Sequence, residues 1–139
     1  MFNKTIIIAE IGVNHNGNIE KAKELIKAAK NCKADYVKFQ TFDPNKLIIK
    51  NHKKSDYQIN NTNKKESLFQ MLKKLSFNFT QTKQLFQYGK SIGIKCLSTP
   101  FDEDSVDYLS KLNMDFYKIS SGDINNFSLL KKISKKNKP

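Results

Sequence analysis

The chain has 139 residues, a length that excludes any single-chain fold needing roughly 250 residues to close. A hydrophobic fraction of 38% with 10 Phe and 5 Tyr is enough to build a core, which excludes wholesale disorder. The formal charge of +12 comes entirely from lysine, and because no arginine is present to fork around phosphates or guanine edges, we do not expect nucleic acid as a partner.

Short runs of β-branched and aromatic residues alternate with longer stretches of helical period along the chain. Four such runs, at residues 4–9, 35–39, 94–98 and 115–119, are almost continuously apolar, which is typical of strands covered on both faces of a sheet. The alternation predicts an α/β fold of four βα units around a parallel sheet.

The first expected helix covers residues 19–32 and carries one apolar stripe, formed by Ile19, Ala22, Ile26 and Ala29. Asn18 is its expected N-cap. After the second expected strand, the segment 43–65 is rich in Asn and Lys, which predicts a loop with a lid as one interpretation, and His52 within it is expected to be solvated. A short helix with an apolar stripe then follows, carrying Leu68, Met71, Leu72 and Leu75.

Three further helices are expected, each opened by a side chain that accepts hydrogen bonds from the first turn. The predicted caps are Thr80, then Asp102 or Asp104, then Asn125 or Asn126. The acidic run at residues 102–104 is favoured by the helix dipole, so we assign it no chemistry.

The two cysteines, Cys32 and Cys96, lack the spacing of a zinc site and lie inside regular segments, so we expect reduced core residues and no structural metal. The apolar run at residues 6–9 is cut by Glu10 and is too short for a signal peptide or a membrane span. We therefore expect a cytoplasmic protein without a membrane partner.

Polar side chains follow every expected strand, and in a parallel α/β sheet the ligand site lies at the carboxyl ends of the strands. The strand-end groups are Glu10, then Lys38 and Gln40, then Ser98 and Thr99, then Lys118, Ser120 and Ser121. Lys38 and Lys118 each interrupt an apolar run, where a cation is costly without an anion. Either lysine alone would be expected to reach water, but two at matching positions indicate a shared pocket for a phosphate or a carboxylate.

The other polar groups at this edge each allow two interpretations. Glu10 suits either a catalytic carboxylate or a structural one bonded to loop N–H groups, and His15 suits either a proton-transfer contact or a filled polar gap. Gly122 completes a Ser-Ser-Gly turn that can cradle a phosphate, although such turns are common in ordinary loops. Asp123 and Asn125 suit ligand binding or helix capping.

Four ordered blocks resemble the amino-terminal part of the sialic acid synthase family, which makes N-acetylneuraminate, legionaminate and pseudaminate. They are AEIGVNHNG at residues 9–17, VKFQTF at 37–42, LSTPFD at 97–102 and YKISSGDINN at 117–126. The resemblance implies the first four of eight βα units, a half TIM barrel spanning residues 1–139, with the other half and an antifreeze-like domain absent. It also implies a transferase that condenses phosphoenolpyruvate with an N-acetylated amino sugar, such as N-acetylmannosamine, and releases phosphate.

By position in the resemblance, four residues are implied contacts of the phosphoenolpyruvate phosphate: Lys38, Thr99, Lys118 and Ser121. Glu10 and Gln40 are implied near the reacting centre, and Asp123 at an acidic position that handles water. The family requires a divalent metal, manganese or magnesium, whose ligands the resemblance places outside this chain.

Two hypotheses of different class follow. The first is a truncated or split synthase fragment that is inactive alone and works with a complementing carboxyl-terminal fragment. The second is a half-barrel binding or assembly module that pairs with itself or another chain and keeps only its anion affinity. The residues leave the identity of the amino sugar open.

Overall fold

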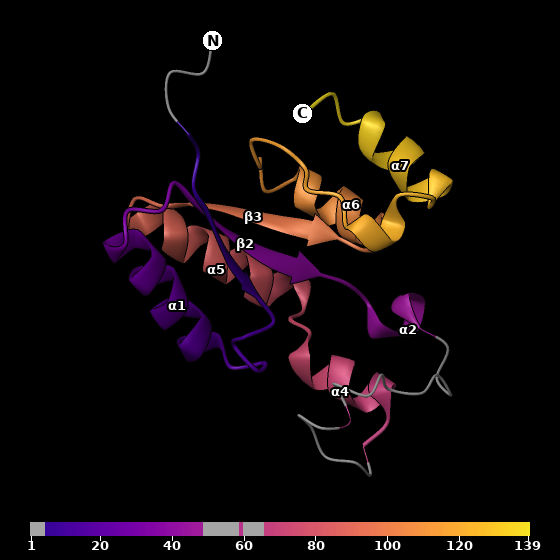
Figure 1. The fold of residues 1–139 in the computed structure, drawn as a ribbon, viewed down its shortest axis with the longest axis horizontal. Coiled ribbons are helices and arrows are strands. Elements are labelled where there is room, and N and C mark those ends of the chain that lie inside the picture. Colours follow the sequence, from indigo (N-terminus) through magenta and orange to yellow (C-terminus); the bar gives the residue numbers. More distant parts are fainter. Residues whose placement is uncertain (1–4, 49–58, 60–65) are drawn as a thin grey trace.

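The computed structural model describes residues 5–48, 59 and 66–139, and three parallel strands lie at its centre (Figure 1). They are β1 (Ile8–Gly12), β2 (Tyr36–Thr41) and β3 (Lys95–Pro100), in the spatial order β1-β2-β3. Each follows an expected run but extends further toward the carboxyl end, so the polar groups expected just after the strands lie within them. The α/β class with a parallel sheet is therefore confirmed.

The strand expected at residues 115–119 does not form, and that prediction is wrong. The backbone of this segment has other partners, since the Tyr117 N–H donates to the Pro139 carbonyl at 2.8 Å. On β3, the Ser98 N–H donates to the Met114 sulfur at 3.2 Å. Met114 and Tyr117 are both buried, so the segment buries its apolar side chains without joining the sheet.

The helices follow the expected positions closely. They are α1 (Ile19–Asn31), α2 (Pro44–Leu47), α4 (Leu68–Leu75), α5 (Phe79–Ser91), α6 (Glu103–Ser110) and α7 (Phe127–Ser134), with a short 3₁₀ turn η1 (Ser121–Asp123) before α7. α2 lies inside the segment expected to be a loop. Most of the remaining segment, including His52, lies outside the described residues, so the lid interpretation stays a prediction.

Three of the four expected helices with predicted caps begin at an expected residue. Asn18, Asp102 and Asn126 each accept a backbone N–H at the start of their helix, as expected. Thr80 is not a cap. Asn78 begins α5 instead, because its side chain accepts from the Gln81 N–H while the Gln81 side chain accepts from the Asn78 N–H.

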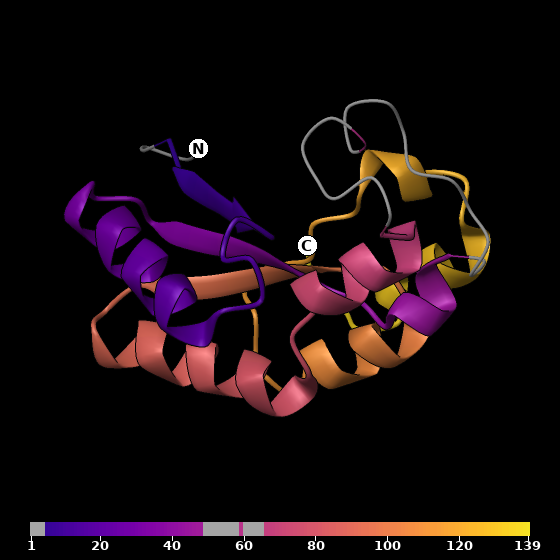
Figure 2. The same ribbon diagram turned by 90° about the horizontal axis from the view of Figure 1, so that it is seen from below.

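Helices α1 and α5 pack against each other and against the same side of the sheet (Figure 2). The apolar stripe of α1 is confirmed there by buried Ala22, Ile26 and Ala29. Gly89 lets α5 approach β3 closely, since a Cβ on it would lie 2.4 Å from the Cys96 sulfur. Cys96 is buried as expected, but Cys32 is exposed at the end of α1, so the prediction that it is a core residue is wrong.

A second cluster of buried residues lies between β3 and the helices α6 and α7, and contains Leu97, Val106, Leu109, Leu129 and Ile133 among others. Its centre is separate from the cluster under α1 and α5, although Phe86 contacts both. None of the helices among the described residues is both long and apolar enough to cross a membrane.

Candidate active site

Four of the predicted site residues gather on one face of the sheet. Glu10 on β1 pairs in register with Lys38 on β2, and Gln40 on β2 pairs with Thr99 on β3. Side chains two apart on a strand share a face, so Lys38 and Gln40 point the same way. The sheet register alone therefore brings Glu10, Lys38, Gln40 and Thr99 together.

The contacts of Lys38 define the centre of this cluster. Its Nζ forms an ion pair with Glu10 Oε2 and lies 3.4 Å from Thr99 Oγ1. The Lys38 side chain is only 13% exposed, whereas that of Glu10 is 48% exposed. A cation this sheltered requires a nearby anion, and Glu10 supplies one from the solvent side.

Gly12 explains how Glu10 and Gln40 fit beside each other. A Cβ on Gly12 would lie 3.1 Å from Glu10 Oε1 and 3.6 Å from Gln40 Nε2, and the residue has φ of +55°. The register of β1 against β2 shifts between Glu10 and Gly12, as at a β-bulge. A glycine at a strand end is a recognised sequence signal for such a bulge.

The opposite face of the same strands has a different role. Thr41 and Ser98 are buried there, and their hydroxyl oxygens lie 2.7 Å apart. Ser98 was expected among the strand-end polar groups, but the alternation of β3 turns it away from Thr99. Its hydroxyl is satisfied within the fold.

The remaining predicted site residues lie on the connection that leads into α7. Lys118 is exposed and donates to the carbonyl of Ile119 at 2.6 Å, so the expectation of a second lysine embedded in a strand is wrong. The reason is that residues 115–119 do not join the sheet. Ser121 is exposed, and Asp123 Oδ1 accepts from Asn126 Nδ2 at 3.2 Å. Among the described residues, no hydrogen bond or ion pair connects this segment to Lys38.

His15 lies in the loop after β1 and is 1% exposed. Its Nδ1 accepts from the Gly17 N–H at 3.0 Å, and its ring stacks on Phe77 with centroids 4.0 Å apart. Burial lowers the pKa of His15 to about 4, so the imidazole is neutral near pH 7. Of the two interpretations, the geometry favours the filled polar gap.

Asp102 organises the backbone next to the site and was assigned no chemistry. It is buried, and its carboxylate accepts from the Asp43 N–H at 2.9 Å and from both the N–H and hydroxyl of Ser105 at 2.8 Å. It thereby joins the start of α2 to the start of α6. The sequence signalled only a helix cap here, because the contact with Asp43 spans 59 residues.

A divalent metal does not fit the residues described. Nowhere in the described part of the chain do three or more His, Cys, Asp or Glu side chains gather as ligands would. The chemistry available at the cluster is that of an ammonium group, an amide, a hydroxyl and a carboxylate. Such a set binds a phosphate or carboxylate through charge-assisted hydrogen bonds.

Comparison with known proteins gives relatives with shared chemistry in their names. The chain is 47% identical over 135 residues to the N,N'-diacetyllegionaminic acid synthase of Campylobacter jejuni, covering 97% of the chain and 40% of that relative. It is 39% identical over 137 residues to the N-acetylneuraminate-9-phosphate synthase of Mus musculus, covering 96% and 37%. The chain thus spans about two fifths of the length of these curated relatives.

Solved structures show the same arrangement. A putative spore coat polysaccharide biosynthesis protein E from Chromobacterium violaceum superposes with a TM-score of 0.78 at 28% identity, covering 98% of this chain and 40% of that one. An N-acetylneuraminic acid synthetase from Leptospira borgpetersenii shares the fold with a TM-score of 0.76 at 23% identity, covering 98% and 45%. Residues 25–139 match the family described as the NeuB family, and the chain belongs to that family.

Proposed function

We propose that this chain provides the phosphoenolpyruvate-binding part of a nonulosonic acid synthase. The reaction joins the enol carbon of phosphoenolpyruvate to the aldehyde carbon of an N-acetylated amino sugar, after which water adds to the resulting cationic carbon and phosphate leaves. The observation that carries the proposal is the sheltered ammonium of Lys38, held between the Glu10 carboxylate and the Thr99 hydroxyl. Three relatives are named as synthases of N,N'-diacetyllegionaminic acid, N-acetylneuraminate-9-phosphate and pseudaminic acid, and these names support the same class of product.

Each residue of the cluster has a proposed role. Lys38 and Thr99 bind the phosphate and balance its charge through the reaction, since both offer donors on one face of the sheet. Gln40 and Glu10 face the reacting carbons, where an amide orients the substrate and a carboxylate accepts or returns a proton. Glu10 is proposed to leave the ammonium when the substrate anion arrives, because the carboxylate already pairs with Lys38.

The connection into α7 completes the proposal. Lys118 and Ser121 are proposed as further phosphate contacts and Asp123 as the group that handles the attacking water. Exposure of Lys118 and Ser121 leaves both available to a ligand. Because no hydrogen bond or ion pair joins this connection to Lys38 among the described residues, we propose that the anion itself draws the two groups together.

Binding by the chain itself tests the proposal. Phosphoenolpyruvate titrated into the protein in a calorimeter should give saturable heat, and Lys38→Met should weaken the binding by about tenfold or more, the value of one charge-assisted contact. Lys27→Met is the matched control, since Lys27 is an exposed lysine on α1. Equal weakening by both substitutions would show only general electrostatic attraction and would contradict the proposal.

Catalysis is proposed to need more than this chain, because the chain spans only about two fifths of the length of its curated relatives. The protein mixed with phosphoenolpyruvate, N-acetylmannosamine and manganese should release no phosphate and form no sugar acid. Clear turnover would overturn this part of the proposal while leaving the binding site intact. Turnover that appears only on adding the remaining part of a related synthase would support complementation.

A second candidate is a module that assembles with another copy through its sheet. Ile6, Ile7 and Ile8 are 45%, 54% and 38% exposed beside or within β1, which is an edge of the described sheet. Exposed apolar edges favour pairing between chains. Sedimentation should show a dimer that Ile7→Lys dissociates, and a well-folded monomer would exclude this candidate.

A further inference from the structure

A groove lies at the amino end of β3, away from the cluster around Lys38. It has a volume of about 730 Å³ and lies between α5, the start of β3 and the turn after α6, a volume typical of small-molecule sites. Tyr36 and Lys95 pair in register at this end of the sheet, whereas Gln40 and Thr99 pair at the other. Four residues of strand span about 13 Å, so the groove is a separate place.

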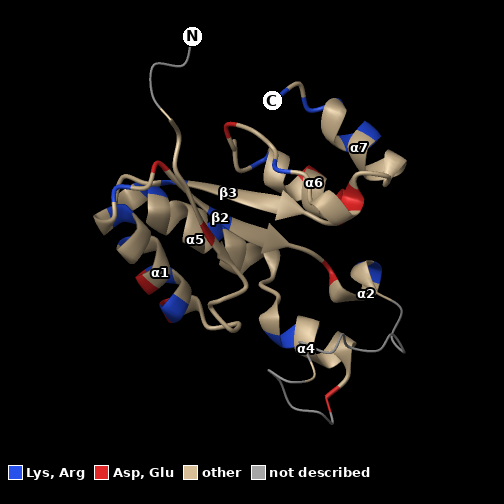
Figure 3. Cartoon of the chain, in the orientation of Figure 1, with Lys and Arg blue, Asp and Glu red and all other residues tan. Residues whose placement is uncertain are grey.

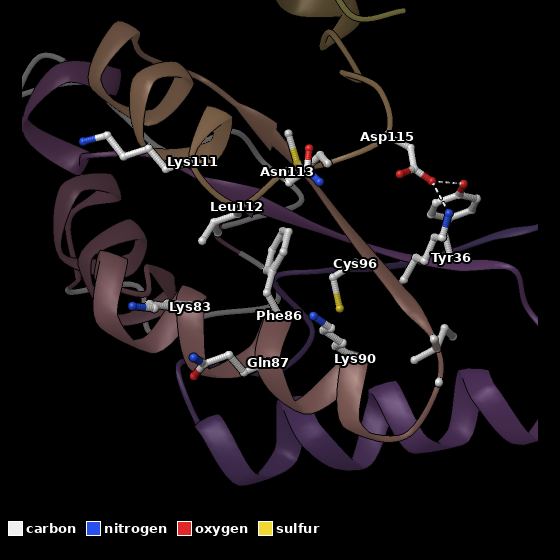
Figure 4. A pocket seen from close by; sticks show the side chains of 14 residues that line it. Tyr36, Lys83, Phe86, Gln87, Lys90, Cys96, Lys111, Leu112, Asn113 and Asp115 are labelled. Atoms are coloured by element: carbon white, nitrogen blue, oxygen red, sulfur yellow. Dashed lines mark hydrogen bonds and ion pairs between the residues drawn. The ribbon is translucent and has the colours of Figure 1, made fainter.

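Three exposed lysines line the two walls of this groove. Lys83 and Lys90 lie seven residues apart on α5, with Gln87 between them, and this spacing places all three on one helix face. Lys111 comes from the turn after α6, on the opposite wall (Figure 4). None of the ion pairs in the described part of the chain uses these three lysines.

The acidic side chain in the lining is already neutralised. Asp115 Oδ2 accepts from the Tyr36 hydroxyl at 2.5 Å and from Lys95 Nζ at 2.6 Å. The hydrogen bond from Lys95 holds the pKa of Asp115 below its ordinary value, so this carboxylate stays ionised and paired. Four lysines and one aspartate line the groove, which leaves three positive charges without a partner there.

The centre of the groove is apolar and flanked by amides. Phe86 and Leu112 lie between the two walls, with Gln87 and Asn113 nearby (Figure 4). Asn113 Oδ1 accepts from Lys138 Nζ at 2.8 Å, which orients its amide nitrogen. An apolar centre that includes an aromatic side chain, with lysines at its rim, suits a heteroaromatic ring joined to phosphates.

We propose that this groove binds a mononucleotide, with its base against Phe86 and Leu112 and its phosphates between Lys83, Lys90 and Lys111. A lone phosphate would leave most of the volume and the whole apolar centre unused. Because α5 and the turn after α6 both contribute, binding depends on the folded arrangement and not on one helix. The site is independent of the one proposed for phosphoenolpyruvate.

Calorimetric titration of the full chain with ATP, inorganic triphosphate and adenosine at physiological salt tests the proposal. ATP should bind, and each of the other two, which carries only part of the ligand, should bind at least about tenfold more weakly. K83E/K111E should weaken ATP binding by about tenfold or more. K27E/K131E carries the same change in net charge on exposed lysines outside the groove, and should leave ATP affinity within about twofold.

Three results would overturn the proposal. Triphosphate binding as tightly as ATP would reduce the groove to a patch of positive charge, and equal losses in the two double variants would show general attraction. Displacement of ATP by an acidic decapeptide at equal concentration would make the groove a protein-docking surface.

Phe86→Leu, which keeps an apolar side chain, should weaken the binding of ATP but not that of triphosphate. Lys38→Met should leave ATP binding unchanged, so failure here is distinguishable from failure of the synthase proposal.

Discussion

The Lys38 ammonium already pairs with a carboxylate of this chain, so any other anion would compete with that carboxylate. The Glu10 carboxylate comes from the adjacent strand at the same register position and already occupies the ammonium group. We therefore propose that a substrate anion exchanges with this carboxylate. The exchange keeps a sheltered cation paired at every stage, which avoids the cost of an isolated charge.

Glu10→Gln tests this exchange. Removing the competing charge should raise the affinity of the chain for inorganic phosphate by roughly threefold to tenfold, while the free energy of unfolding falls by about 1 kcal/mol because Lys38 loses its partner. Titration calorimetry and urea unfolding measure the two effects. Weaker phosphate binding in Glu10→Gln would show that the carboxylate assists the anion, contrary to the exchange.

His15 predicts a defined pH dependence of stability. Its pKa falls from 6.5 to about 4 on folding, so between those values the unfolded chain binds a proton that the folded chain excludes. The stability that neutral His15 contributes is fully present above pH 6.5. It declines as the pH falls from 6.5 to about 4, and it changes no further below that pH. The full pKa shift sets an upper limit on this effect. We expect the free energy of unfolding to fall by about 2 kcal/mol across the window.

Urea unfolding of His15→Asn at several pH values between 7 and 4 measures this contribution. Asn keeps an acceptor for the Gly17 N–H but does not titrate, so the variant should be less stable at pH 7 and show a flatter pH profile. The same substitution at His52 is the control. A wild-type slope in His15→Asn would mean that other groups cause the dependence.

The residues of the candidate site were predictable to different degrees for a physical reason. Glu10, Lys38, Gln40 and Thr99 come together through strand alternation and parallel pairing, both of which the sequence pattern specifies. The position of Lys118 depends on whether residues 115–119 join the sheet, and no local sequence pattern determines whether they do. Alternation also shows, in retrospect, that Ser98 and Thr99 cannot serve the same face.

At the scale of elements, two possible caps, Asn78 and Thr80, lie two residues apart at the start of α5, and only Asn78 acts as the cap. Asn78→Ala should lower the free energy of unfolding by about 1 kcal/mol, because the reciprocal hydrogen bonds with Gln81 are lost. Thr80→Ala is the matched control and should leave stability unchanged or slightly raised, as alanine favours helix interiors. Urea unfolding compares the two, and a larger loss at Thr80 would contradict the observed cap.

Helices and strands differ in how far their positions follow from sequence alone. Caps and apolar stripes act within a few residues, so the helix positions could be predicted with only small errors at the ends. A strand also requires a backbone partner far away in sequence. Residues 115–119 have the expected apolar pattern, but their N–H and carbonyl groups are not paired with β3, and the pattern contains no information on that choice.

At the scale of the whole molecule, the charge is distributed and the apolar core is divided. Lysines occur on α1, α2, α4 and α7 and are mixed with acidic residues on several elements (Figure 3). The lysines are therefore spread over several elements of the described structure. The two buried clusters share Phe86, so the halves on either side of β3 are mechanically joined at α5.

The two cysteines differ in exposure, and this difference allows the packing of α5 against the sheet to be measured. Cys32 is exposed, whereas burial raises the pKa of the Cys96 thiol to about 12, and thiolates are the species that react with maleimides. Mass spectrometry of the native protein should show one adduct forming rapidly, and the second should appear only when urea opens the structure. Simultaneous modification of both would refute the packing around Gly89. In dilute denaturant, the rate of the slow second addition would report how often α5 opens away from β3. The two native cysteines suffice, so no labelling site needs to be introduced by mutation.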